Sequence, residues 1–191
     1  MTSIVRRDRL AALVVASAAV IVLAACSSGT GAGSSSAPTA PPFTSASTSI
    51  ASPVDKAKQD ALAAYLGMWQ DFVAASATSD WQSSKLGRYA TGTALNTLSR
   101  GLYADHYKGL VTKGEPTHST QVSTVEPPAN PTKVVVTDCS DSTNALKYRA
   151  DNGQLADNTP GGRRLINGIV ERQGDGSWKV SDFGVREVGS C

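Results

Sequence analysis

The stretch that decides the fold is residues 52–76, SPVDKAKQDALAAYLGMWQDFVAAS. Ser52 is a favourable N-cap, Pro53 suits the first helical position and Asp55 places a negative charge in the first turn, so a helix is predicted to begin here. The larger side chains behind this start recur at helical spacing, which predicts one packed face. That stripe consists of Leu62, Tyr65, Leu66, Trp69, Phe72, Val73 and Ser76.

Two further helices are predicted downstream of this long one. A short helix is expected over residues 81–86, and a longer one from Thr91 or Gly92 to about Lys108. Gly109 is a suitable residue to end the longer helix, because glycine readily adopts the conformation found after a helix C-terminus. The buried seam of the longer helix is expected to be Leu95, Leu98 and Leu102.

After Gly114 the composition changes to short runs of Val, Thr and Ile separated by Pro, Gly, Asn and Asp. This composition is typical of strands and turns, and the strands are expected to pair in antiparallel fashion. The last two should form a hairpin through residues 174–176, Gly-Asp-Gly. The predicted strands are 118–126, 132–139, 146–150, 162–173 and 177–188.

The final strand carries a change of side-chain parity. Trp178 and Val180 share one face, whereas Phe183 and Val185 would fall on the other, which predicts a β-bulge near residues 181–182. Because a bulge bends a strand, the sheet should be curved. Helices followed by a curved antiparallel sheet define an α+β fold in which the N-terminal helices pack on the sheet.

The N-terminal 25 residues have the pattern of an export signal. Basic residues (Arg6, Arg7 and Arg9) precede an apolar run from Leu10 to Leu23, which is too short to span a bilayer but suits the core of a signal peptide. Residues 23–26, Leu-Ala-Ala-Cys, resemble the bacterial lipobox. The resemblance implies that residues 1–25 are removed and that Cys26 carries acyl chains; the alternative is a secreted protein that is cleaved elsewhere.

A linker is predicted to separate this cysteine from the folded domain. Residues 27–52 are almost entirely Ser, Thr, Ala, Gly and Pro and carry no charge, so they cannot bury enough apolar surface to fold. A flexible chain of that length spans roughly 25–30 Å on average. The chain is therefore divided into a signal peptide (1–25), a lipidated cysteine with its linker (26–52) and an α+β domain (53–191).

The other two cysteines are expected to form a disulfide. The sequence contains three cysteines, and lipidation of Cys26 would leave Cys139 and Cys191 in an oxidising compartment, where two thiols should pair. The bond would attach the C-terminus to the sheet.

Charge and composition exclude several partners. Of the 18 basic and 16 acidic residues, three and one lie in the signal peptide, so the rest of the chain is neutral. A neutral chain lacks the basic surface that nucleic-acid binding requires. With two histidines, His106 and His118, no metal site and no cofactor are expected. Asp138 and Asp141 are interpreted as turn residues rather than calcium ligands.

Three short motifs carry a family resemblance. Residues 134–142 (VVVTDCSDS), residues 176–180 (GSWKV) and the terminal Cys191 are similar to those of small secreted actinobacterial lipoproteins with a nuclear-transport-factor-two-like cone. The resemblance implies that residues 53–191 form a cone, or cystatin-like roll. It also implies a location on the extracytoplasmic face of the cell membrane, anchored by the lipid. It implies no particular reaction.

A cone fold encloses a pocket between its sheet and helices, and the candidate pocket residues are Tyr65, Trp69, Asp105, His106 and Tyr107. The leading hypothesis is a non-enzymatic envelope protein that binds an apolar small molecule or a protein partner. One alternative is an isomerase or dehydratase with an Asp or His base in the pocket. The other is an accessory interaction domain of a transporter or cell-wall enzyme, which predicts a filled pocket and an exposed apolar patch.

Overall fold

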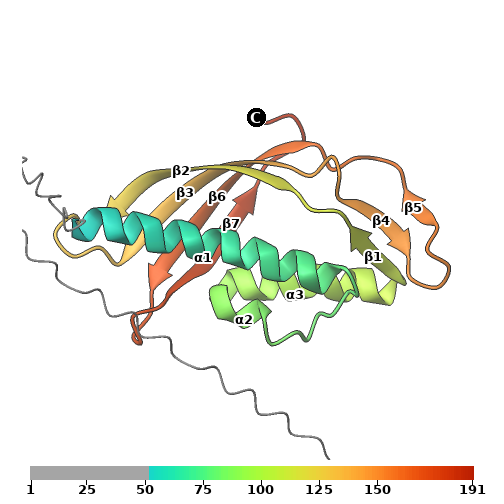
Figure 1. The fold of residues 1–191 in the computed structure, drawn as a ribbon, viewed down its shortest axis with the longest axis horizontal. Helices are drawn as coiled ribbons and strands as arrows, with labels where there is room; N and C mark the ends of the chain where they lie inside the picture. Colours follow the sequence, from blue (N-terminus) through green and yellow to red (C-terminus); the bar gives the residue numbers. More distant parts are fainter. Residues whose placement is uncertain (1–51) are drawn as a thin grey trace, which may run out of the picture. The chain divides into compact units, whose positions relative to one another are not determined.

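The computed structural model describes residues 52–191, which contain three helices and seven strands in two antiparallel sheets (Figure 1). The predicted signal peptide, Cys26 and the linker up to residue 51 lie outside the described residues. The helices are α1 (Pro53–Ser76), α2 (Leu86–Tyr89) and α3 (Gly92–Tyr107). The strands are β1 (Leu110–Lys113), β2 (Thr117–Glu126), β3 (Lys133–Asp141), β4 (Leu146–Arg149), β5 (Leu155–Asp157), β6 (Arg163–Arg172) and β7 (Trp178–Val185).

The start of α1 is the one predicted from the sequence. The Ser52 hydroxyl accepts a hydrogen bond from the Asp55 backbone N–H at 3.1 Å, which confirms the N-cap. The buried face, however, is rotated from the predicted stripe: its fully buried positions include Ala57, Ala61 and Ala64, whereas most of the large side chains lie partly buried along one edge. Small side chains let the helix approach the sheet closely, and the aromatic edge is left to form a wall.

The prediction of a helix over residues 81–86 is wrong. Residues 81–85 form turns, in which the Asp80 carboxylate accepts a hydrogen bond from the Gln82 N–H at 3.2 Å, and α2 begins only at Leu86. This side-chain bond competes with helical pairing of the backbone. In contrast, α3 lies where it was predicted, and Gly109 follows its end with φ of +65°.

The main sheet has the strand order β2-β3-β6-β7, and a smaller sheet has the order β1-β4-β5. The five predicted strands are confirmed, although β7 ends at Val185 rather than at 188. The two strands missed by the sequence analysis, β1 and β5, have only four and three residues and belong to the smaller sheet. Segments so short carry little periodicity, and they are strands because β4 pairs with both.

The predicted bulge in β7 is confirmed. Val170 of β6 pairs with Val180, and its neighbour Ile169 pairs with Asp182, so Ser181 is the extra residue. A second bulge in β2 places Ser123 between the paired Val122 and Thr124. Bulges increase the bend of a strand, and Figure 1 shows the main sheet curving over α1.

The core lies between α1 and the concave face of the main sheet. The larger of its two clusters contains Tyr65 and Met68 from α1 together with Val134, Val136 and Val180 from the sheet, and a smaller cluster joins α1, α2 and α3. All fully buried members of both clusters lie between residues 57 and 180. Within residues 52–191, the helices and the main sheet therefore share a hydrophobic core.

The C-terminal segment is attached to the main sheet by a disulfide and by backbone hydrogen bonds. Cys139 of β3 and Cys191 form the expected disulfide, with Cα atoms 5.9 Å apart. The segment before Cys191 continues along β6, since the Arg186 and Gly189 N–H groups donate to the carbonyls of Leu165 (2.9 Å) and Arg163 (2.7 Å). Within residues 52–191, no helix has the length and apolar character needed to cross a membrane.

Candidate functional site

A buried carboxylate, that of Asp138, lies on the core-facing side of β3. Residues of alternating parity on β3 face the core, so Asp138 shares the buried face of Val134 and Val136 and is fully inaccessible to solvent. Its Oδ2 accepts a hydrogen bond from the Tyr65 hydroxyl at 3.0 Å and lies 2.6 Å from His118 Nδ1. Its Oδ1 accepts the Ser119 N–H at 2.9 Å. The interpretation of Asp138 as a turn residue is therefore wrong.

In this arrangement, the Tyr65–Asp138–His118 cluster, the buried negative charge is surrounded by hydrogen-bond donors. Three donors surround the carboxylate, which compensates for its removal from water. Burial raises the pKa of the Tyr65 phenol, and the negative charge of Asp138 raises it further, so Tyr65 remains a donor across the physiological range. Because an ionised carboxylate only accepts hydrogen bonds, His118 carries its hydrogen on Nδ1.

Asp141, three residues along β3, does form a turn. Its carboxylate accepts hydrogen bonds from the hydroxyl and the N–H of Thr143, and these bonds lower its pKa. In residues 52–191 no three His, Cys, Asp or Glu side chains are grouped in a way that could hold a metal ion.

The ring of Trp69 separates this cluster from the pocket of the cone. It stacks on His118 with ring centroids 5.8 Å apart and meets the rings of Tyr65, Phe72 and Phe183 edge-on. Its Nε1 is buried and is unpaired among the described residues. The aromatic edge of α1 thus covers the polar cluster on one side and faces a cavity on the other.

This cavity has a volume of about 240 Å³ and lies between the C-terminal half of α1, the concave face of the main sheet and the smaller sheet. Its walls are apolar along α1 and at Ile166 and Val185, and polar along β3 and β6. The lining residues are Trp69, Phe72, Val73, Ser76, Asp105, Thr112, Gly114, Pro116, Ser140, Ser142, Ala145, Lys147, Arg164, Ile166 and Val185.

Three charged side chains border the cavity. Asp105 at the end of α3 forms an ion pair with Lys147 of β4, so these two charges offset each other. Arg164 of β6 donates from Nε to the Gly161 carbonyl at 3.2 Å and has no ion-pair partner within residues 52–191. The cavity is thus an apolar pocket with one uncompensated positive charge.

The five candidate pocket residues do not come together as a group. Trp69 and Asp105 line the cavity, and Tyr65 lies behind Trp69 bound to Asp138. The placement of His106 and Tyr107 in the pocket is wrong, because both are exposed and Tyr107 is 82% accessible. The last turn of α3 directs these two side chains to solvent while Asp105, on its other side, pairs with Lys147.

Sequence reasoning missed the residues that dominate the site, namely Asp138, His118 and Arg164. The parity of β3 was the available signal for Asp138, since an acidic residue two positions after Val136 in a strand shares its buried face. His118 and Arg164 follow from pairing with β3, opposite Ser140 in both cases. That pairing register was not readable from the chain alone.

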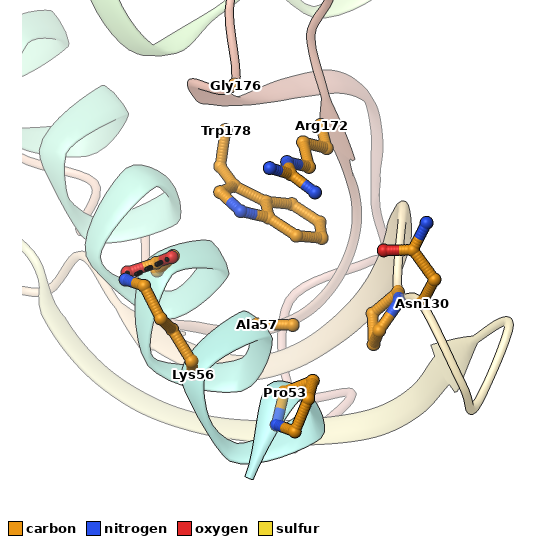
Figure 2. A pocket seen from close by; sticks show the side chains of 9 residues that line it. Pro53, Lys56, Ala57, Asn130, Arg172, Gly176 and Trp178 are labelled. Carbon is orange, nitrogen blue, oxygen red and sulfur yellow. Dashed lines mark hydrogen bonds and ion pairs between the residues drawn. The ribbon is translucent and has the colours of Figure 1, made fainter. Parts of the chain in front are cut away.

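A second hollow lies at the other end of α1, with a volume of about 260 Å³ (Figure 2). Figure 2 shows the Trp178 ring on its inner side, the Arg172 guanidinium beside that ring, and Lys56 of α1 in the foreground. Lys56 is paired with Asp60 at 2.9 Å. The hollow is bordered by the charged side chains of Lys56, Asp60 and Arg172, and its apolar lining is limited to Pro53, Ala57, Pro131 and Trp178, which makes it the weaker candidate for a site that binds an apolar molecule.

Comparisons with known proteins give similarities of fold. No protein-family model matches the chain, and no match is found among curated proteins. Among solved structures, the intermembrane space region of the chloroplast protein ARC6 is 19% identical, with a TM-score of 0.45 and coverage of 67% of this chain and 97% of that one.

Two bacterial structures give similar values. ActVI-ORFA from Streptomyces coelicolor is 13% identical with a TM-score of 0.45, covering 68% of this chain and 96% of its own. A ketosteroid isomerase-like protein from Erwinia carotovora atroseptica is 10% identical with a TM-score of 0.42. The match covers 68% of this chain and 94% of that protein. The α+β class of this chain is defined by its own helices and sheets.

Proposed function

We propose that this protein is a lipid-anchored binding module of the cell envelope, whose cavity between α1 and the main sheet holds a small, largely apolar molecule. The single observation that carries the proposal is the cavity of about 240 Å³, walled by Trp69, Phe72, Val73 and Ile166. A concave pocket with mostly apolar walls and a few polar groups is the usual form of a small-molecule site.

The proposed location is supported by two features at opposite ends of the chain. The lipobox-like residues 23–26 follow a basic segment and an apolar run. The disulfide between Cys139 and Cys191 is the kind of bond that persists in an oxidising compartment outside the cytosol. A short tether between acyl chains and the folded domain would keep the cavity close to the membrane surface.

Binding is favoured over catalysis by the position of the titratable groups. Asp138, the most buried carboxylate among the described residues, accepts three hydrogen bonds and is inaccessible to solvent, so no substrate in the cavity would touch it. Asp105 reaches the cavity but is held by Lys147. An accessory interaction domain would be expected to have a filled cavity, and the open volume favours a small-molecule ligand instead.

The proposal is tested by blocking the cavity. Residues 52–191 are titrated with 1-octanol, a small neutral amphiphile, and followed by NMR chemical shifts. Ala145 lines the cavity, so Ala145→Phe should fill it and abolish the shifts, whereas Ala150→Phe, at an exposed turn outside it, should leave them unchanged. Native mass spectrometry of the domain purified from its own envelope should also retain a small molecule. Absence of both signals, or equal binding by both variants, would contradict the proposal.

A further inference from the structure

Ser140 of β3 and Arg164 of β6 are directly opposite each other in the main sheet. Ser140 shares the concave face with Asp138, and Arg164 shares it with Ile166, two residues along each strand. Both residues line the cavity, and opposite residues in an antiparallel pair hold their side chains about 4.5–5.5 Å apart at Cβ. The concave face therefore carries Ser140 and Arg164 on neighbouring strands, and both residues line the cavity.

The donors of this pair are unused. The Nε–H of Arg164 donates to the Gly161 carbonyl, and the terminal nitrogens of Arg164 make no hydrogen bond to another described residue. The Ser140 hydroxyl makes no side-chain hydrogen bond within residues 52–191 either, although Ser140 is only 4% exposed. The cavity lining therefore contains a hydroxyl and a guanidinium whose donors have no acceptor among the described residues.

The charged side chains that line the cavity have a net charge of one positive unit, which one monovalent anion would balance. Lys147 is matched by Asp105, and no carboxylate among the described residues matches Arg164. Along the other wall, Trp69 and Phe72 present aromatic rings. The cavity therefore has a cationic end with hydrogen-bond donors and an apolar body.

On the basis of the proposed function, we propose that the ligand is a small amphipathic carboxylic acid, whose carboxylate binds Arg164 and Ser140 and whose apolar part lies against Trp69 and Phe72. The fork of a guanidinium matches the two oxygens of a carboxylate, and a hydroxyl supplies a third hydrogen bond. A volume of about 240 Å³ lies below the roughly 300 Å³ at which typical ligand pockets begin, so the acid is short.

The chemistry of the pair favours a carboxylate over a phosphate. A phosphate ester carries more charge and more acceptor oxygens than one guanidinium and one hydroxyl satisfy. The net single positive charge of the lining matches a monoanion. A carboxylic acid is ionised at neutral pH, so it would enter the cavity as a monoanion.

The test compares octanoate with 1-octanol on residues 52–191 by isothermal titration calorimetry. The two probes share an eight-carbon chain and differ in the carboxylate. Octanoate should bind at least tenfold more tightly than 1-octanol. Arg164→Met should weaken octanoate by about ten- to a hundredfold, the range for a hydrogen bond to a charged group, and leave 1-octanol unchanged. Ser140→Ala should weaken octanoate less, by severalfold.

The matched control is Arg163→Met, because Arg163 is the neighbour of Arg164 on the exposed face of β6. This control should bind octanoate like the wild type. Equal binding of the two probes, with no effect of Arg164→Met, would overturn the carboxylate assignment while leaving the apolar cavity as a binding site. Failure of both probes to bind would overturn the assignment together with the proposed function. Circular dichroism of each variant excludes loss of fold as the cause.

Discussion

The Tyr65 hydroxyl donates to Asp138 Oδ2 across 3.0 Å and so joins the middle of α1 to the middle of β3. The two residues are 73 positions apart in the chain and are both fully buried. His118 of β2 shares the same oxygen, so one carboxylate connects the helix with two strands of the main sheet. This polar connection gives α1 directional contacts with the sheet, in addition to its apolar packing.

Replacement of the carboxylate should therefore destabilise the fold. In Asp138→Asn, the side-chain amide brings two N–H donors into a site that already contains three, and at least one buried donor loses its acceptor. We expect a loss of about 1–3 kcal/mol in the free energy of unfolding, measured by urea denaturation. Asp141→Asn is the control, because asparagine can form the same turn with Thr143 and should change stability by less than about 0.5 kcal/mol. Equal effects of the two substitutions would contradict a structural role for Asp138.

The Tyr65 phenol should give the protein an alkaline stability limit. Its pKa is raised in the folded state by burial and by the charge of Asp138, so the folded state holds the proton more strongly than the unfolded state. The resulting stabilisation is complete below the unfolded pKa of about 10 and is lost as the pH rises from there toward the folded pKa. The melting temperature of the wild type should fall steeply above about pH 10.

Tyr65→Phe should lower the melting temperature at neutral pH, because Asp138 loses a donor, but should flatten the alkaline decline. Tyr107→Phe is the matched control: Tyr107 is 82% exposed, so its removal should leave the pH profile unchanged. An alkaline decline of the same steepness in Tyr65→Phe would show that other groups cause it.

Gly168 of β6 is required by the close approach of Tyr65. A Cβ atom at this position would lie 2.8 Å from Cε2 of the Tyr65 ring, which is closer than such contacts occur. Gly168→Ala should therefore displace the ring and cost about 1–3 kcal/mol of stability. Gly184→Ala in the neighbouring strand β7 meets nothing within 4 Å and should be neutral or slightly stabilising. Urea unfolding of the two variants tests this, and equal stability of both would contradict the packing.

The disulfide should contribute substantially to stability. It joins residues 52 positions apart, and the chain-entropy model gives about 4 kcal/mol as an upper value for such a loop. Cys139→Ser in residues 52–191 should therefore lower the free energy of unfolding by about 2–4 kcal/mol and leave one titratable thiol. The wild-type domain should have none under denaturing, non-reducing conditions. Two free thiols in the wild type would contradict the bond.

The proposed lipid attachment at Cys26 predicts how the protein is distributed between membrane and medium. The wild type should fractionate with membranes and carry the mass of fatty acyl chains on an N-terminal cysteine. Cys26→Ala should release the protein or leave an uncleaved precursor, whereas Ser27→Ala, which keeps residues 23–26 intact, should behave like the wild type. Unchanged membrane retention and mass in Cys26→Ala would refute the anchor.

The parts of the fold that sequence patterns predicted are those governed by near neighbours. Ser52 caps α1 through a residue three positions away, and the parity change between Val180 and Phe183 marked the bulge at Ser181. The predicted helix over residues 81–86 was wrong because another local contact, the hydrogen bond from the Gln82 N–H to the Asp80 carboxylate, outweighed a weak apolar pattern. Local rules decide where elements begin, end and bend.

The site depends on contacts that no local pattern contains. His118 meets Asp138 only because β2 and β3 pair in one register, and Arg164 faces the cavity only because Ser140 is its partner across the sheet. The tail of α3 shows the opposite case: Asp105, His106 and Tyr107 are consecutive, yet only Asp105 reaches the cavity. Which of these three side chains points to the cavity is set by the packing of α3 against its neighbours.

The position of Trp69 gives the molecule an intrinsic optical reporter. One face of the indole lies on the imidazole of His118, and the residue also borders the cavity, so a guest entering the cavity changes the polarity around the fluorophore. Occupancy can thus be followed by emission wavelength in unlabelled protein, with Trp81 and Trp178 as a constant background outside that cavity.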